Sequence, residues 1–142
     1  MAVLGPYSVT LEVPDLEEGV GFYTDAGLIA ARDGARAQLR CAGQDHESVV
    51  LLGGYPRKRL HHVTLRAAQL GDMAPRIKAA GGAVIAAPVG HDDEGLWVED
   101  PHGMLIHLIE RPDDAPLDAG PPFEINAPGR LVRKCRSAIL PG

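Results

Sequence analysis

The chain has 142 residues, enough for one domain with its own hydrophobic core or for two small modules that share a core. Its 45% hydrophobic and 23% charged residues are ordinary for a folded domain, and no apolar run approaches the roughly 18 residues that span a bilayer. The net charge of -5 gives no reason to expect nucleic acid, and two distant cysteines, Cys41 and Cys135, cannot make a disulfide framework, so we expect a cytoplasmic protein with reduced thiols and no membrane partner.

The first predicted strand covers residues 8–13, where polar and apolar side chains alternate as in a half-buried strand. Asp15 follows as a helix N-cap, with Glu18 three residues later in a variant of the capping box. The predicted helix runs to about Ala26 and stops at Gly27. Short apolar runs then predict strands at residues 28–31, 37–41 and 48–52.

The second half repeats this pattern, because Val9-Thr-Leu11 recurs as Val63-Thr-Leu65 in another alternating segment. Asp72 is the expected cap of a second helix, which Gly81-Gly82 ends. Further strands are predicted at residues 84–87, 95–99 and 104–109, with a type I turn at Asp100-Pro-His-Gly103 between the last two. The sequence therefore predicts an α+β domain over residues 1–110, built from two tandem βαβββ modules at about 5–54 and 58–110.

Residues 111–142 differ in character from the rest of the chain. They hold half of the 12 prolines and show no sustained helical or strand period. Such a segment cannot bury enough apolar surface to fold alone. We expect a proline-rich C-terminal linker, or an arm that wraps another surface.

Three features together carry a family resemblance. The paired βαβββ pattern, Val13-Pro-Asp-Leu16 followed by Phe22-Tyr23, and the Asp100–Gly103 turn before the last strand resemble the vicinal oxygen chelate superfamily of glyoxalases, bleomycin resistance proteins and extradiol dioxygenases. Gln38-Leu-Arg-Cys41 and the strand after it are most similar to the N-terminal domain of type I extradiol ring-cleaving dioxygenases. The resemblance implies a curved mixed sheet around a cleft.

The resemblance also implies where a divalent metal would bind. Members use inward residues on the first and last strands of each module, and by motif position these are Ser8, Leu51, His62 and His107. A usual set of two histidines and a carboxylate holds Fe(II) or Mn(II) by one face. Here Ser8 replaces the expected first histidine, His107 replaces the expected glutamate, and Leu51 cannot ligate. His62 and His107 alone would bind a metal weakly, and in two-domain extradiol enzymes the N-terminal domain keeps the fold without the metal site.

The remaining candidates are residues of the strands and turns around the expected cleft. Strand alternation turns His62 toward the cleft and the adjacent His61 away from it. His46 and His102 lie in predicted turns and are expected to be exposed, and His91 belongs to an acidic, solvated loop with Asp92, Asp93 and Glu94. Tyr7 and Trp97 are candidates for the cleft wall. The candidate polar groups of the cleft are Glu12, Arg40, Arg66 and Glu99.

Three functions remain open at this point, and catalytic and substrate-binding residues stay unassigned. The first is an extradiol-type, iron-dependent dioxygenase acting on a catecholic or related aromatic molecule, or its N-terminal domain alone. The second is a metal-free protein of the bleomycin-resistance type that binds a small molecule. The third, a glyoxalase-type isomerase or lyase, would need a positioned carboxylate base. We expect a homodimer, or contact with a C-terminal domain that follows residue 142.

Overall fold

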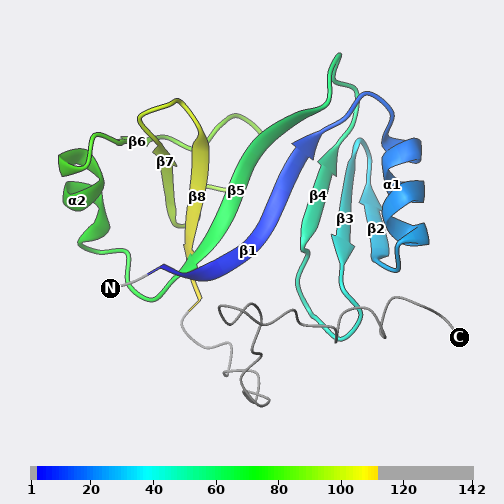
Figure 1. Ribbon diagram of the computed structural model, residues 1–142, viewed down its shortest axis with the longest axis horizontal. Helices are drawn as coiled ribbons and strands as arrows, with labels where there is room; N and C mark the ends of the chain where they lie inside the picture. Colours follow the sequence, from blue (N-terminus) through cyan, green and yellow to red (C-terminus); the bar gives the residue numbers. More distant parts are fainter. Residues whose placement is uncertain (1–2, 112–142) are drawn as a thin grey trace, which may run out of the picture. The chain divides into compact units, whose positions relative to one another are not determined.

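The computed structural model describes residues 3–111, which form one mixed sheet with two helices (Figure 1). The predicted α+β class is therefore confirmed. The elements are β1 (Val3–Glu12), α1 (Leu16–Asp25), β2 (Ile29–Asp33), β3 (Arg36–Arg40), β4 (Val49–Leu52), β5 (Arg59–Ala67), α2 (Met73–Ala79), β6 (Ala83–Ile85), β7 (Leu96–Glu99) and β8 (Leu105–Glu110). The order βαβββ thus occurs twice, although the interpretation of the halves as tandem copies stays a prediction. The predicted arm lies outside the described residues, apart from Arg111.

The long strands β1 and β5 lie at the centre of the eight-stranded sheet, whose order is β2-β3-β4-β1-β5-β8-β7-β6. They pair antiparallel with each other, and each has a parallel neighbour on its other side, β4 beside β1 and β8 beside β5. Successive side chains of a strand point to opposite faces of the sheet. The two central strands can therefore supply side chains to both faces at the centre of the sheet.

Two apolar clusters pack the helices against the sheet. Helix α1 covers a cluster centred on the buried Ala37, Leu39 and Leu51, and α2 contributes Met73 to a second cluster that includes Leu108. In Figure 1, α1 lies beside the half of the sheet made by β2, β3 and β4, and α2 lies at the opposite end near β6. No helix within residues 3–111 is long and apolar enough to cross a membrane.

The predicted turn between β7 and β8 is present. The N–H of Gly103 donates to the carbonyl oxygen of Asp100 at 3.0 Å. One carboxylate oxygen of Asp100 also accepts from the N–H groups of His102 at 2.8 Å and Met104 at 2.9 Å. Asp at the first turn position therefore closes the hairpin through its own side chain.

The two helices begin at the predicted aspartates but are capped differently. The Asp15 carboxylate accepts from the N–H of Glu18 at 3.2 Å, as expected of an N-cap. Asp72 stands at the corresponding position of α2 and makes no side-chain hydrogen bond to that helix. The sequence places both caps correctly, whereas the structure decides which of them is bonded.

This difference gives a matched pair of substitutions. We expect Asp15→Ala to lower the free energy of unfolding by about 1 kcal/mol, because one N–H of the first turn loses its acceptor. Asp72→Ala should lower the free energy of unfolding by clearly less, since this substitution removes no such hydrogen bond. Urea denaturation of both variants measures the two changes, and equal losses would show that the Asp15 bond contributes nothing.

Candidate functional site

The sheet face opposite the helices carries a polar pocket of about 190 Å³. Paired residues of neighbouring strands build it, because Thr10 lies opposite His62, and Thr64 lies between Ser8 and His107. These side chains are buried although all are polar. The aromatic wall predicted from Tyr7 and Trp97 lines the same pocket.

His62 is held in the pocket by two neighbours. Its Nε2 lies 3.4 Å from the hydroxyl oxygen of Thr10, and its Nδ1 lies 2.7 Å from Nδ1 of His61. Both ring nitrogens therefore have a partner inside the protein. A metal ion could bind His62 only after one of these contacts had been broken.

A β-bulge explains the contact between two consecutive histidines. Thr10 pairs with His62 and the next residue, Leu11, pairs with Leu60, so His61 is an extra residue of β5 without a counterpart in β1. Such an insertion interrupts the alternation of side chains. The bulge brings the His61 ring into contact with His62, while the lining of the pocket includes His62 and not His61, as strand alternation predicted.

His107 is fixed by a backbone carbonyl and an aromatic ring. Its Nε2–H donates to the carbonyl oxygen of Glu94 at 2.6 Å. Its ring stacks on Trp97 with the centroids 4.2 Å apart and the planes within 6°. The structure thus brings His62 and His107 to the same pocket, with ring centroids 6.1 Å apart.

Two histidines expected on solvated turns prove to be partly buried. His91 lines the pocket and stacks on His61 at 4.5 Å, so its expected place in a solvated loop is wrong. His46 stacks on Tyr7 at 4.2 Å. His102 is exposed, as predicted. Sequence alone gave no signal for these stacks, because both rings reach partners on distant strands.

Burial favours the neutral form of His62 and of two histidines beside it. It is the main cause that lowers the pKa of His62 from 6.5 to about 3, and the nearby His61, His91 and His107 add to the effect. The pKa values of His61 and His91 are also lowered, again chiefly by burial. Arg36 lines the same pocket, and its buried Nε has no hydrogen-bond partner among the described residues.

Leu51 does not occupy the position expected of it. It pairs with Leu11 in the sheet and belongs to the cluster under α1, on the face away from the pocket. The residue opposite Thr10 is Val50, which lines the pocket in its place. The motif alignment therefore named the residue after the one that lines the pocket. Neither Val50 nor Leu51 has a side chain that could bind a metal.

The residues at the expected ligand positions of this pocket do not fit the usual iron set of two histidines and a carboxylate. Ser8 and Val50 supply no charged ligand at the other two positions, and both histidines already have hydrogen-bond partners. No group of three histidine, cysteine or acidic side chains within residues 3–111 is arranged to hold a metal ion.

The other predicted polar candidates lie outside this pocket. The buried Glu12 forms an ion pair with Arg59 at 3.1 Å. Arg40 is exposed and donates to the carbonyl oxygen of Gln44 at 3.2 Å. Neither Arg66 nor Glu99 lines the pocket. A further ion pair does line the pocket. Arg111 donates to both carboxylate oxygens of Glu94, at 2.6 and 3.3 Å. This contact lowers the pKa of the Glu94 side chain.

The fold defines a class of α+β proteins in which one mixed sheet carries helices on one face and a pocket on the other. The sequence model of the glyoxalase/bleomycin resistance protein/dioxygenase superfamily matches residues 7–108. The chain belongs to this superfamily, which confirms the resemblance seen in the sequence.

Individual relatives agree with this assignment. Metapyrocatechase 2 of Cupriavidus necator is 29% identical over 143 residues, which cover 92% of this chain and 42% of that protein. The Mn(II)-bound glyoxalase of Novosphingobium aromaticivorans has a TM-score of 0.65 at 24% identity, over 76% of this chain and 39% of that one. The 2,3-dioxygenase LapB of Pseudomonas sp. KL28 has a TM-score of 0.64 at 24% identity, over 78% and 41%. The chain thus spans about two fifths of the length of these relatives.

In a shorter structural neighbour, the same fold makes up nearly the whole protein. Methylmalonyl-CoA epimerase of Mycobacterium tuberculosis is 20% identical with a TM-score of 0.56, and the match covers 76% of this chain and 88% of the epimerase. At this identity the similarity concerns the fold alone. The fold by itself therefore does not choose between ring cleavage and isomerisation.

Proposed function

We propose that this chain serves as the metal-free, N-terminal domain of an extradiol-type dioxygenase that acts on a catecholic or related aromatic molecule. The observation that carries the proposal is the pocket itself, where both ring nitrogens of His62 have partners in Thr10 and His61, and Ser8 and Val50 stand where charged ligands would be needed. Ring cleavage would then take place in a second pair of modules that supplies two histidines and a carboxylate.

Two further observations support this function. The 29% identity to a metapyrocatechase extends over 92% of the chain but over only 42% of that enzyme. The pocket of about 190 Å³ is also smaller than the roughly 300–1,000 Å³ typical of sites for drug-sized ligands. This small size argues against the alternative of a binding protein that sequesters an aromatic ligand on this face of the sheet.

The proposal predicts how the chain behaves with iron. After anaerobic loading with Fe(II) and desalting, residues 1–142 should retain far less than one iron per chain, because Ser8 and Val50 supply no carboxylate ligand beside His62 and His107 on the strands. The loaded chain should consume no oxygen with a panel of catechols. Elemental analysis and an oxygen electrode measure both quantities, and stoichiometric iron together with a ring-cleavage product would contradict the proposal.

A second prediction concerns the coding sequence. It should continue past Gly142 into two more βαβββ modules that carry the two histidines and the glutamate, and the longer protein should cleave catechols when loaded in the same way. A stop codon directly after Gly142 would remove the N-terminal-domain role. A metal-free chain that consumes no oxygen would then fit a binding protein better.

A further inference from the structure

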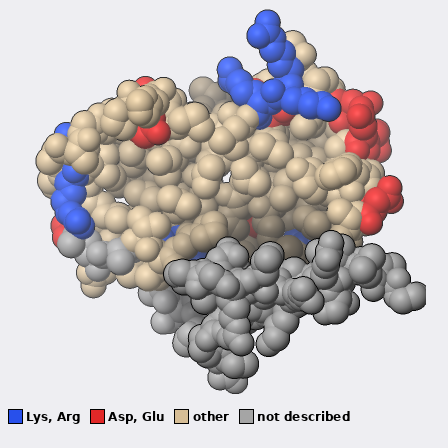
Figure 2. Space-filling model, viewed as in Figure 1, with Lys and Arg blue, Asp and Glu red and all other residues tan. Residues whose placement is uncertain are grey.

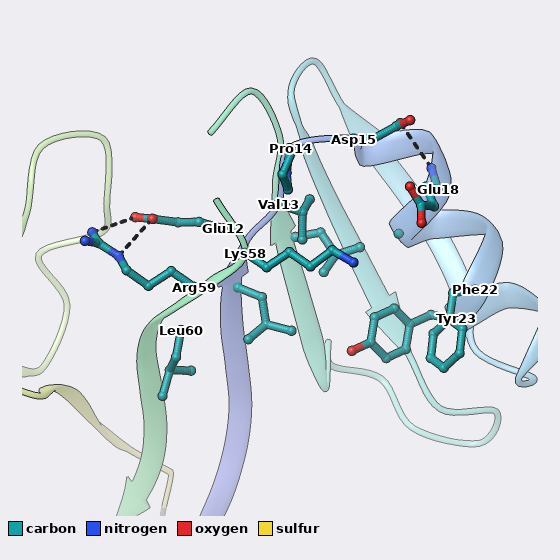
Figure 3. A pocket seen from close by; sticks show the side chains of 13 residues that line it. Glu12, Val13, Pro14, Asp15, Glu18, Phe22, Tyr23, Lys58, Arg59 and Leu60 are labelled. Carbon is teal, nitrogen blue, oxygen red and sulfur yellow. Dashed lines mark hydrogen bonds and ion pairs between the residues drawn. The ribbon is translucent and has the colours of Figure 1, made fainter. Parts of the chain in front are cut away.

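A groove of about 560 Å³ lies between α1, the C-terminal part of β1 and the beginning of β5 (Figure 3). Its floor is apolar and includes Leu11, Val13, Leu51 and Leu60. Leu11, Val13 and Leu51 also belong to the cluster under α1, so the groove opens on the helix-covered face of the sheet. It is therefore separate from the histidine pocket on the other face.

An aromatic pair forms the rim of the groove on the side of α1. The Phe22 ring packs edge-on against Tyr23 with the centroids 5.2 Å apart, yet Phe22 remains 67% exposed. A large apolar side chain left in water beside an apolar floor is typical of a surface that another molecule covers. Aromatic residues in such places supply much of the binding energy of protein interfaces.

The two sides of the groove carry opposite charges. Glu18 lies on α1 and Lys58 just before β5, and both line the groove (Figure 3). Neither side chain has an ion-pair partner within residues 3–111, whereas Arg59 is bound to Glu12. Figure 2 shows basic side chains gathered over the connection between β4 and β5, and acidic side chains beside them over α1.

We propose that this groove is the interface of a symmetric homodimer. A two-fold axis through an apolar centre exchanges the two sides, so that Lys58 of one copy meets Glu18 of its partner and Glu18 meets Lys58. The two Phe22 rings would then pack into the facing groove across the centre. A surface with one acidic and one basic edge is complementary to itself in this way, which makes a second copy the occupant that the charges favour.

Charge exchange provides the test. We expect the chain to be a dimer in sedimentation equilibrium, and Lys58→Glu or Glu18→Lys to weaken it about tenfold or more, because each places like charges together at two symmetric points. The double variant carrying both substitutions should recover most of the wild-type dimer. Phe22→Ser should weaken the dimer about a hundredfold, since it removes the apolar anchor.

Matched controls separate the interface from the general effect of charge. Lys78→Glu on α2 and Asp93→Lys in an exposed loop change the net charge equally but lie outside the groove, so both should remain dimeric. Circular dichroism of each variant verifies that the fold is retained. A wild-type chain that is monomeric at all concentrations, or a double variant no stronger than either single one, would overturn the proposal. So would a monomer in which Phe22→Ser abolishes binding of anilinonaphthalene sulfonate, because the groove would then be a small-molecule site.

Discussion

Gly95→Ala is expected to lower the free energy of unfolding by about 3 kcal/mol or more. Gly95 precedes β7 with φ at +76°, a region that residues with a side chain rarely adopt. A Cβ atom built there would lie 2.1 Å from the carbonyl oxygen of Leu108. That oxygen belongs to the backbone of β8, so the clash can be relieved only by moving one strand away from the other.

Gly90→Ala is the matched control for this effect. Gly90 also has a positive φ, of +83°, but a Cβ atom there would meet nothing within 4 Å. Gly90→Ala should therefore lower the free energy of unfolding by only about 1 kcal/mol, the conformational penalty of a positive φ. Urea denaturation at neutral pH measures the loss of unfolding free energy in both variants. Similar losses would show that the close approach of β7 to β8 adds no penalty at Gly95.

Gly95→Ala should also disturb the histidine pocket. The carbonyl oxygen of the preceding residue, Glu94, accepts the hydrogen bond from His107. A shift of this backbone would lengthen that bond and change the stack of His107 on Trp97. The fluorescence of Trp97, the single tryptophan of the chain, should therefore change in this variant and stay constant in Gly90→Ala.

The second large effect is a loss of stability in mild acid. The pKa of His62 is about 3 in the folded protein and near 6.5 when the chain is unfolded, so the unfolded state binds more protons between these values. His62 therefore contributes stability that is complete above pH 6.5 and is lost as the pH falls toward 3. Between pH 7.5 and pH 5 the loss should be about 2 kcal/mol.

His62→Gln tests this assignment. The variant should lose most of the difference in unfolding free energy between pH 7.5 and pH 5, because no buried group at that position then needs to stay neutral. A smaller dependence should remain from His61 and His91, whose pKa values are also lowered. His102→Gln removes an exposed histidine and should leave the wild-type difference unchanged. If His62→Gln kept the full difference, the titrating group would lie elsewhere.

Elements that depend on local interactions were predicted well. Helix α1 begins after Asp15 because the carboxylate of that residue bonds to an N–H three residues later, and both partners are visible in the sequence. The turn at Asp100 was predicted for the same reason. Alternation likewise placed Ser8 and His62 on one buried face.

The features that sequence analysis missed arise where pairing between strands decides the result. The bulge at His61 appears only when β5 is aligned with β1, and it brings two consecutive histidines into contact. The prediction placed Leu51 in the pocket, where the structure has Val50. A shift of one residue along a strand moves a side chain to the other face of the sheet. His91 reached the pocket because its loop lies against β5, a contact that no local pattern encodes.

By itself the sequence determined the class of fold, the positions of the helices and turns, and the absence of a carboxylate at the expected ligand positions. Periodicity, capping and residue identity are properties of short segments, so they can be recognised without knowledge of the rest of the chain. Only the tertiary structure decided that both ring nitrogens of His62 and Nε2 of His107 have partners in the protein. It also decided that an apolar groove with charged edges lies on the opposite face of the sheet. Both features arise from residues far apart in the chain, whose distances are fixed only when the strands pair and α1 packs against them.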